Sequence, residues 1–378
     1  MALCLFVMKY PLHLRENLRG KFDGQMAAMR ALGHEVYCIG WNRQGMWLLG
    51  EGKQKMLMRC PLTRIPGYDH TFIFVDLMRA VRKVLKERKV DLLYWRYMPT
   101  FGNALGTAKA IKAQGGKLVM EFPTFPREEE NRRSLLRRPV FVYADRVLHK
   151  LSPLIDLYTA IGQPCGGKID DRPAMNIVNG VDVERFPLHI PNPGNREVHL
   201  LAVASMAGWH GYDRLLRAMA EYQGPVKVYF HLAGSDGDGS LSRWKELAQE
   251  MDLDDRAVFH GPLYGEELNR LVASCDVGVG SLGMFRFGLT NGMPLKLREY
   301  MARGLPFVYA VEDAAIPQNP RFCLKVSNDD CPIDLEPIVD FALRAKEDGE
   351  APRLMREHAR HHMSWQSVMN GVLERLDR

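Results

Sequence analysis

Residues 276–310, DVGVGSLGMFRFGLTNGMPLKLREYMARGLPFVYA, carry the clearest pattern in the chain. It predicts an apolar strand, a glycine-rich loop, a helix, a glycine and a second strand, which is the order of a parallel βαβ unit. We expect the helix to open at Met293 or Pro294, because proline is favoured in a first turn, where its missing N–H is not needed. The free N–H groups and the positive helix end at such a point favour an anion.

Two charged residues of this helix are candidates for the site. Lys296 falls in the first turn, where the helix dipole alone would favour an acid. A lysine placed there gains most if a phosphate neutralises it. Glu299 is three residues further on and shares a helix face with Lys296. An ordinary Lys–Glu pair on a surface helix has the same spacing, so the residues by themselves leave both interpretations open.

Outward from this stretch, the chain alternates between strands and helices in two halves. In the first half we expect a loop rich in glycine and tryptophan after residue 39, strands at 2–8, 35–39, 91–97, 118–122 and 157–161, and helices at 22–32, 71–89, 103–114 and 128–150. In the second half we expect strands at 199–204, 226–233, 257–259, 277–280 and 306–310, and helices at 211–222, 241–251, 265–275, 294–303, 334–346 and 351–376. This alternation predicts an α/β fold with parallel sheets.

Residues 184–198 contain three prolines and show no periodicity, so they are the predicted linker. We therefore expect a first domain at 1–188, a second domain at 195–355, and a C-terminal helix, 356–378, that packs back towards the first domain. Two domains also suit a chain of 378 residues, because single cores stop growing near about 250–300 residues.

Composition narrows the class of protein. Hydrophobic residues make up 46% and charged residues 25%, which is typical of globular proteins. The apolar runs are far shorter than the roughly 20 residues that span a bilayer, and the N-terminal stretch lacks the pattern of a signal peptide. The seven cysteines form no CxxC pair, so a reducing cytoplasm is expected, without a structural zinc site.

Charge is distributed unevenly. The first 190 residues hold 30 Lys+Arg and 18 Asp+Glu, whereas the remainder holds 21 and 27. The basic runs 79–89 and 127–138 fall on predicted helices, where solvated faces are the usual explanation. The alternative is docking at an anionic membrane surface, where each basic residue contributes roughly 1 kcal/mol. Nucleic acid is not an expected partner, because no recognition motif accompanies the charge.

Several segments together resemble one family. Four segments are similar, in this order along the chain, to segments of retaining GT-B glycosyltransferases of the family-4 type: NIVNGVDVERF at 176–186, ASMAGWHGYDRLLRAM at 204–219, VFHGPLYGEELNRLVASCDVGV at 258–279 and EYMARGLPFV at 299–308. Together with EFPTFPREEE at 121–130, they resemble the branch found in bacterial capsule and exopolysaccharide clusters.

This resemblance implies two Rossmann-like domains facing each other across a cleft. It implies a hexosyltransferase that transfers a sugar, with retention and without a metal, from a UDP- or GDP-linked donor on the second domain. The acceptor on the first domain would be a polysaccharide or a lipid-linked glycan, and the nucleotide sugar is a co-substrate, so no cofactor is expected. By position, the resemblance implies that Glu299 binds the ribose and that Leu263 and Tyr264 lie near the base. The residues that it implies for the diphosphate are Gly292, Met293, Leu295 and Lys296.

The chain departs from the family pattern at two points. Asn291 stands eight residues before Glu299, where the family often has a glutamate that contacts the sugar. His210 stands where the family tends to have a lysine. We therefore expect the diphosphate to draw positive charge from Lys296, from Arg286 and from a protonated His210, and we count these three as catalytic candidates.

The acceptor side is assigned to the end of the predicted strand at 118–122. Glu121, a further catalytic candidate, and Thr124 are the polar groups expected to meet an acceptor hydroxyl, and Gly20 is placed on the same side. A carboxylate simply paired with a neighbouring arginine is the alternative for Glu121.

Two other functions stay open. A non-catalytic, nucleotide-sugar-binding subunit of a glycosyltransferase complex would explain the departures at Asn291 and His210, and an epimerase on the same fold is a second rival. SDGDGS at 235–240 contains an Asp-x-Asp pattern that binds metals in another fold, but we expect a turn here.

Overall fold

The computed structural model describes residues 1–12, 19–65, 68, 73–99, 101–125, 138–162, 165–194, 196–319 and 321–377. The chain folds into two compact units. The first comprises Met1–Val178 together with Trp365–Arg378, and the second comprises Asn179–Ser364. The sequence instead predicts the linker between the domains at the proline-rich residues 184–198. Val181 and Val183, which directly precede these residues, are buried in a core of the second unit.

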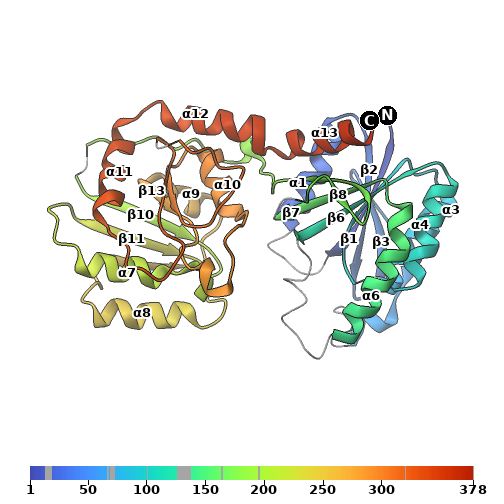
Figure 1. The fold of residues 1–378 in the computed structure, drawn as a ribbon, viewed down its shortest axis with the longest axis horizontal. Helices are drawn as coiled ribbons and strands as arrows, with labels where there is room; N and C mark the ends of the chain where they lie inside the picture. Colours follow the sequence, from blue (N-terminus) through green and yellow to red (C-terminus); the bar gives the residue numbers. More distant parts are fainter. Residues whose placement is uncertain are drawn as a thin grey trace. The chain divides into compact units, whose positions relative to one another are not determined.

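The first unit is built on a nine-stranded sheet (Figure 1). Its strand order is β4-β3-β2-β1-β5-β6-β7-β9-β8, and the run from β2 to β9 is parallel. The strands are β1 (Leu3–Pro11), β2 (Glu35–Asn42), β3 (Gly45–Gly50), β4 (Lys53–Arg59), β5 (Leu92–Arg96), β6 (Lys117–Phe125), β7 (Leu157–Gly162), β8 (Lys168–Ile169) and β9 (Arg172–Asn176).

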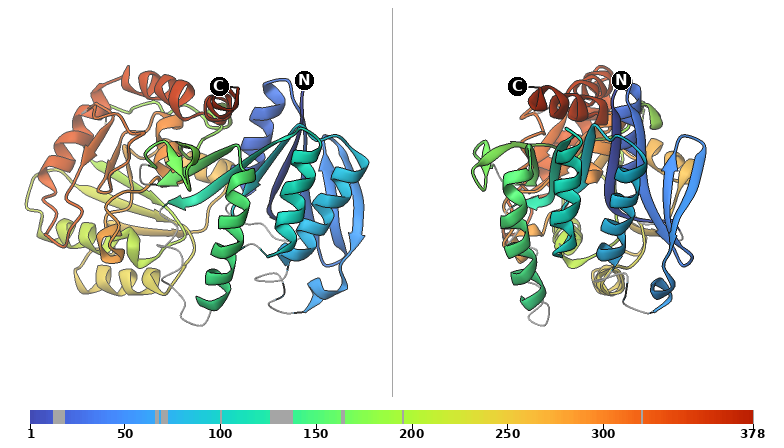
Figure 2. Two further views of the ribbon diagram at one scale, coloured as in Figure 1. Left: turned by 45° about the vertical axis from the view of Figure 1, so that its right-hand side comes forward. Right: turned by 90° about the vertical axis from the view of Figure 1, so that its right-hand side faces the viewer.

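Helices cover both faces of this sheet (Figure 2). One face carries α3 (Ile73–Glu87), α4 (Asn103–Ala113) and α6 (Arg138–Leu151), and α1 (Arg19–Ala31) lies on the other. α13 (Trp365–Leu376) packs against α1, although it is the last helix of the chain. The unit also has the short 3-10 turns η1 (Pro61–Arg64) and η3 (Ser152–Leu154).

The second unit is built on a six-stranded sheet, in which every pair of neighbouring strands is parallel. Its order is β12-β11-β10-β13-β14-β15. The strands are β10 (Val198–Val203), β11 (Val228–Ala233), β12 (Ala257–Gly261), β13 (Val277–Val279), β14 (Phe307–Tyr309) and β15 (Cys323–Lys325). Parallel strands place all their carboxyl ends at one edge, and the loops beyond that edge carry the candidate site.

Two apolar cores lie on opposite faces of the second sheet. One core joins the sheet to α7 (Tyr212–Glu221), α8 (Ser240–Glu250) and α11 (Glu336–Glu347). The other joins it to α9 (Gly265–Ala273), α10 (Leu295–Arg303), α12 (Ala351–His358) and η4 (Val183–Arg185). The remaining turns of the unit are η5 (Gly208–His210), η6 (Met284–Phe287) and the π-helical η7 (Ala359–Met363).

Three aspartates align neighbouring strands of the two sheets in the same way. Asp91, Asp156 and Asp276 each precede a strand. Each carboxylate accepts a backbone N–H at the start of the neighbouring strand, at 2.8 Å from Leu3, 2.7 Å from Leu118 and 2.7 Å from His199. A buried backbone N–H needs such a partner, so these contacts fix where the paired strands begin.

The structure adds the strands β8, β9 and β15, which the sequence analysis does not predict, and it differs from the predicted elements in two further places. Residues 45–59 form the antiparallel hairpin β3–β4 rather than a loop, with Met46 and Leu48 buried in the core. The closing helix predicted at 351–376 is broken, because Ser364 is extended and bridges to Val181. Of the predicted helix at 128–150, residues 128–137 lie outside the described part, and α6 covers the rest.

Among the described residues, no helix combines the length and the apolar character needed to cross a membrane.

Candidate functional site

The candidate site begins where β13 ends and α10 starts. α10 begins at Leu295, one or two residues later than expected, and Pro294 precedes it with an extended backbone. Lys296 is therefore the second residue of the helix. The first backbone N–H groups of an α-helix have no acceptor within the helix, so those of Leu295 and Lys296 are open to a ligand.

Two long-range contacts hold this loop in place. The Asn179 side chain donates to the carbonyl of Met293 at 2.9 Å. One turn into α10, the fully buried Arg298 forms a bidentate ion pair with Asp313, and its Nε donates to the Asn179 carbonyl at 3.4 Å. A buried ion pair stabilises a structure only when its geometry satisfies both groups, and this geometry fixes the start of α10.

Lys296 is half-buried, and its Nζ donates to the hydroxyl of Tyr212 at 2.8 Å. Within the described ranges, no carboxylate forms an ion pair with this ammonium. Burial lowers the pKa of Lys296 to about 7, and the nearby Glu299 opposes that effect only in part. A partly desolvated ammonium without a counter-ion binds an anion strongly.

Glu299 lies on the same helix. Burial raises the pKa of its carboxyl group above the ordinary value, and the positive charges of Arg303, Arg185 and Lys296 act in the opposite direction. A carboxylate can accept two hydrogen bonds from neighbouring hydroxyls, which suits a diol such as a ribose.

Asn291 and Gly292, which lie shortly before α10, are less available to a ligand than Lys296. Asn291 is exposed, and its side-chain amide donates to the Thr290 hydroxyl at 3.2 Å. The backbone N–H of Gly292 donates to the Glu312 carbonyl at 2.9 Å. The N–H of Gly292 therefore already has an acceptor in this conformation, and the contact of Gly292 with a diphosphate stays a prediction.

His210 ends η5 and is almost fully buried. Burial, together with the charge of Lys296, lowers the pKa of His210 to about 2. Nδ1 of His210 lies 3.2 Å from both the backbone nitrogen and the carbonyl oxygen of Ala207, so one neutral tautomer accepts a hydrogen bond there and the other donates one. We therefore expect a neutral His210 in the free protein, and a protonated His210 beside a bound diphosphate stays a prediction, because an anion raises the pKa of an imidazole. A neutral imidazole can still donate a hydrogen bond from the nitrogen that carries its proton.

Arg286 lies on η6, and its guanidinium is bound to Asp213 of α7 by two hydrogen bonds of 2.9 and 2.7 Å. A third bond of 3.3 Å reaches the Gly208 carbonyl. The carboxylate of Asp213 raises the pKa of Arg286, so this residue stays charged. Its charge is, however, already offset by Asp213, unlike that of Lys296.

Glycine allows these loops to approach each other. Gly211 has a φ of 64°, and a Cβ added to it would lie 2.5 Å from the backbone nitrogen of Gly283. A side chain at position 211 would therefore separate the start of α7 from the loop that carries Arg286. This close approach brings Tyr212 and Asp213, which are consecutive in the sequence, to Lys296 and Arg286.

The other expected ligand contacts lie on different strands or in the other unit. Leu263 is half-buried and Tyr264 is 77% exposed, beyond the carboxyl end of the edge strand β12. Gly20 is exposed in the first turn of α1. Thr124 lies at the end of β6, but its side chain is outside the described part of the chain.

Glu121 is fully buried on β6 and has four hydrogen-bond donors. Its two oxygens accept from Gln25 at 2.7 Å, Tyr94 at 2.6 Å, Arg96 at 2.6 Å and Lys21 at 3.0 Å. Burial alone would raise the pKa of Glu121, but the two cations and the two hydrogen bonds outweigh it and lower the pKa to about 2. A saturated carboxylate of such low basicity cannot act as a base. Glu121 is therefore paired with neighbouring cations, Lys21 and Arg96, as the alternative predicted, and its contact with an acceptor stays a prediction.

The Asp-x-Asp segment is a turn, as expected. Asp236 accepts backbone N–H groups from Gly239 at 2.7 Å and from Asp238 at 3.3 Å. Asp238 accepts the N–H of Gly208 at 3.0 Å, so the turn also supports η5. Among the residues that the structure describes, no cluster of three or more His, Cys, Asp or Glu side chains could hold a metal ion.

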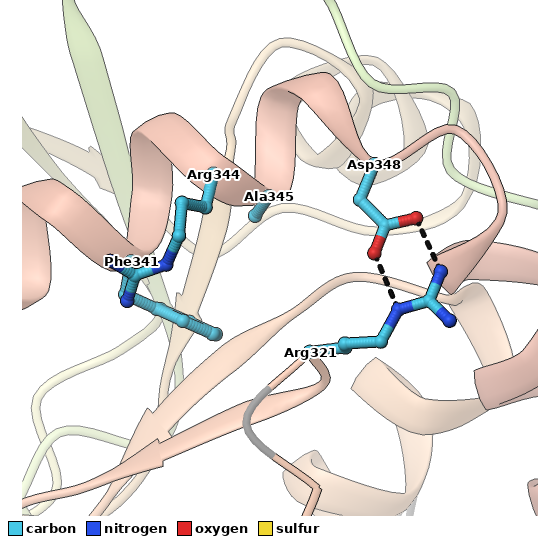
Figure 3. Close-up of a pocket in the computed structure, with 5 residues that line it drawn as sticks. All are labelled: Arg321, Phe341, Arg344, Ala345 and Asp348. Atoms are coloured by element: carbon cyan, nitrogen blue, oxygen red, sulfur yellow. Dashed lines mark hydrogen bonds and ion pairs between the residues drawn. The ribbon is translucent and has the colours of Figure 1, made fainter.

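A shallow hollow elsewhere in the second unit is distinct from this site (Figure 3). It measures about 220 Å³ and is lined by residues of α11 and its surroundings, namely Arg321, Phe341, Arg344, Ala345 and Asp348. Arg321 is occupied by Asp348 through bonds of 2.7 and 2.8 Å. Arg344 is exposed, which makes it a useful control for non-specific anion binding.

Comparison with known proteins identifies the architecture. Residues 197–328 match the sequence profile of a family described as "Glycosyl transferases group 1". The whole chain superposes on sucrose-phosphate synthase from Thermosynechococcus elongatus with a TM-score of 0.65 and 15% identity, over 98% of this chain and 97% of that one. The chain has the GT-B fold.

Two further solved structures with the GT-B fold align with this chain over its whole length. Anabaena HepE in complex with UDP gives a TM-score of 0.62 at 14% identity and is itself fully covered. The catalytic domain of Arabidopsis thaliana starch synthase IV, bound to ADP and acarbose, gives 0.64 at 13% identity over 98% of that chain. No curated protein sequence matches the chain significantly.

Sequence reasoning missed the residues that organise the site of this GT-B protein. Tyr212 and Asp213 lie in the segment at 204–219, whose resemblance assigns them no role, yet they contact Lys296 and Arg286. Asn179 lies in the NGVD segment and secures the loop before α10. One feature of the sequence points to Tyr212. It directly follows a glycine in the loop after a buried strand, and side chains of such loops lie at the carboxyl edge of the sheet.

Proposed function

We propose that this protein is a glycosyltransferase that binds a nucleotide-sugar donor at the carboxyl edge of its second sheet. The observation that carries the proposal is Lys296, an ammonium in the first turn of α10 with no carboxylate partner in the described part of the chain. Glu299, three residues away, supplies a carboxylate for the ribose. A diphosphate beside Lys296 and a ribose beside Glu299 together fit a nucleoside diphosphate.

The chemical step follows from this placement. The bond between the sugar C1 and the diphosphate oxygen breaks, and the diphosphate leaves with the electron pair. The acceptor hydroxyl bonds to C1 on the same face, and its proton passes to the departing diphosphate, because Glu121 is saturated and too weakly basic to receive it. The main contribution of the protein is then electrostatic: the ammonium of Lys296 and the first N–H groups of α10 offset the charge that develops on the diphosphate. We propose retention and metal independence on this basis.

The donor is proposed to be a UDP- or GDP-linked hexose, with UDP-glucose as the first to be tried. HepE, which shares the fold, has been solved with UDP-glucose, whereas starch synthase IV has been solved with ADP. Leu263 and Tyr264 are the residues proposed to lie near the base. Asn291 is proposed to contact the sugar, and His210 is proposed to contact the diphosphate.

A thermal-shift panel of UDP, GDP, ADP and CMP, with and without EDTA, tests the donor site. A ligand at about 100 times its Kd stabilises the protein that binds it by roughly 2.7 kcal/mol. We expect one nucleoside diphosphate to raise the melting temperature of the wild type and of Arg344→Ala equally, and to lose most of this effect in Lys296→Ala. Equal shifts in all three proteins would contradict the role of Lys296, and no shift with any nucleotide would contradict the donor site.

A second function, a nucleotide-sugar-binding subunit without catalysis, is favoured by Asn291, which replaces a carboxylate of the family pattern and is exposed here. Release of free nucleotide from the bound sugar donor distinguishes the two functions. A protein that binds the donor but releases no nucleotide with any glycan or lipid-linked acceptor is a binding subunit.

We further propose that the acceptor is a lipid-linked glycan or a growing polysaccharide, reached at an anionic membrane surface by the first unit. Basic side chains of α3 and α6 are exposed, namely Arg79, Lys83, Lys86, Arg146 and Lys150. The apolar side chains of Val142 and Tyr143 are also exposed on α6, each at 47%. Basic and apolar side chains on one helix are the combination that binds a helix to an anionic lipid surface.

A further inference from the structure

Tyr212 contacts Lys296 directly, and the proposed function gives it no role. Its hydroxyl is 2.8 Å from Nζ of Lys296, and its ring centroid is 5.3 Å from the same atom. The two residues are 84 positions apart in the sequence and come from different helices.

The ring of Tyr212 is held rigidly. The residue is 0% exposed, and it packs edge-on against Phe230 with a centroid distance of 5.6 Å. Trp244 and His210 lie against it at 5.2 and 5.4 Å. A phenol surrounded by three aromatic rings has little freedom to reorient, so any group bonded to its hydroxyl has a fixed position.

The hydrogen-bonding capacity of the phenol fixes the direction of the bond. An ammonium has only donors, so the Tyr212 oxygen accepts from Lys296. Its own proton is directed to the Val279 carbonyl, which lies 3.5 Å away. Both partners of the hydroxyl therefore belong to the end of β13 and the start of α10, the two elements that flank the glycine-rich loop.

A neutral acceptor has a particular advantage at this position. A carboxylate in place of the phenol would orient the lysine but would also offset its charge, as Asp213 does for Arg286. The phenol orients the ammonium and leaves its charge available to a ligand.

We propose that Tyr212 is a positioning residue that orients the Lys296 ammonium towards the diphosphate while leaving its charge uncompensated. This rests on the proposed function for the identity of the ligand, but not for the contact between the two residues. Tyr212 itself acts only through Lys296 and takes no part in bond making or breaking.

The test compares Tyr212→Phe with Tyr300→Phe. Tyr300 is a matched control, because it is also a buried tyrosine whose hydroxyl bonds to backbone carbonyls, at 3.2 Å from Leu201 and 3.5 Å from Val279. Reductive methylation with ¹³C-formaldehyde, followed by NMR titration, reports the pKa of Lys296 without any nucleotide, and Lys296→Met identifies its signal.

We expect the Lys296 pKa to fall in Tyr212→Phe, because the ammonium loses its acceptor, and to be unchanged in Tyr300→Phe. The Kd for UDP, or for whichever nucleotide the panel selects, should rise about tenfold in Tyr212→Phe, because the ammonium is then no longer held in the orientation that binds the ligand. In a Lys296→Met background, Tyr212→Phe should have no further effect on binding, as the double-mutant cycle requires.

An unchanged Lys296 pKa in Tyr212→Phe, or an equal loss of affinity in the Lys296→Met background, would overturn the proposal. If no nucleotide binds to any variant, the proposed function fails, and the NMR titration still decides the contact. Tyr212→Leu serves as a second variant without an acceptor if the phenylalanine variant does not fold.

Discussion

Lys296 and Glu121 show how burial acts differently on two charged side chains. Glu121 is enclosed by two cations and two further donors, so it stays ionised and inert. Lys296 has a single neutral partner, so its charge is not offset within the described structure. A charge that the fold leaves uncompensated at a loop edge indicates a binding site, whereas a fully compensated one indicates a structural role.

Glu121→Gln tests the structural role. The change leaves Lys21 and Arg96 without a counter-charge in the interior, and breaking a buried pair in this way costs about 3–5 kcal/mol. The free energy of unfolding, measured in urea at pH 7, should fall by about this amount. The exposed pair between Glu87 and Lys55 provides a control, and Glu87→Gln should change the unfolding midpoint little.

The same variant should show a defined pH dependence. Because the folded protein lowers the Glu121 pKa from 4.5 to about 2, its contribution to stability is present above about pH 4.5 and is lost as the pH falls towards 2. The difference between wild type and Glu121→Gln should therefore shrink in acid. Equal unfolding midpoints for the two proteins at pH 7 would show that the network does not stabilise the fold.

At the scale of elements, the last helix completes the first unit by packing against the first helix. Trp365 of α13 is buried against α1, where Lys21 lies 5.9 Å from its ring centroid. A Cβ added to Gly24 would lie 2.2 Å from Cδ1 of the same ring. Glycine is therefore required at position 24 for the two helices to approach this closely.

Gly24→Ala tests this contact. Overpacking costs about 1–3 kcal/mol, which exceeds the gain of up to about 1 kcal/mol from the helix propensity of alanine. We expect a lower melting temperature and faster hydrogen exchange in α13. Gly106→Ala, in α4, is the control, because a Cβ there would meet only a side-chain atom of Arg82 at an ordinary 3.5 Å. Unchanged exchange in α13 of the Gly24→Ala variant would contradict the proposed packing constraint.

At the scale of the whole molecule, the uneven charge follows the division into units. Basic residues gather on helices that cover one face of the first sheet, whereas the second unit carries the donor site that we propose. A basic surface attracts anionic lipid over distances of about one Debye length, and salt weakens this attraction. Charge of this kind therefore bears on where the protein binds rather than on how it folds.

Co-sedimentation with vesicles tests the membrane surface. Each basic residue near an anionic bilayer contributes about 1 kcal/mol, so the double change Arg146→Glu and Lys150→Glu should weaken binding to phosphatidylglycerol-containing vesicles by about thirtyfold or more. The same charge change in the second unit, Lys227→Glu with Lys245→Glu, should have little effect. Failure of the wild type to bind anionic vesicles at low salt would exclude this surface as a membrane contact.

Much of the fold was predictable because its signals are local. The strand, loop and helix around residues 276–310, and the alternation on either side, depend on periodicity and on turn residues within short windows. The hairpin at 45–59 was missed, because its core side chains are few and alternate within a glycine-rich stretch. The break at Ser364 was missed because its cause, a bridge to Val181, lies far away in the sequence.

The α/β architecture, and the place of Lys296 and Glu299 in the first turns of one helix beyond an apolar strand, follow from the local sequence. What each candidate side chain can do depends on its neighbours in three dimensions. Tyr212, Asp213 and the donors around Glu121 are far apart along the chain from the residues they contact. The physical reason is that secondary structure depends on neighbours a few residues away, whereas burial, ion pairing and pKa depend on which distant side chains the fold brings together.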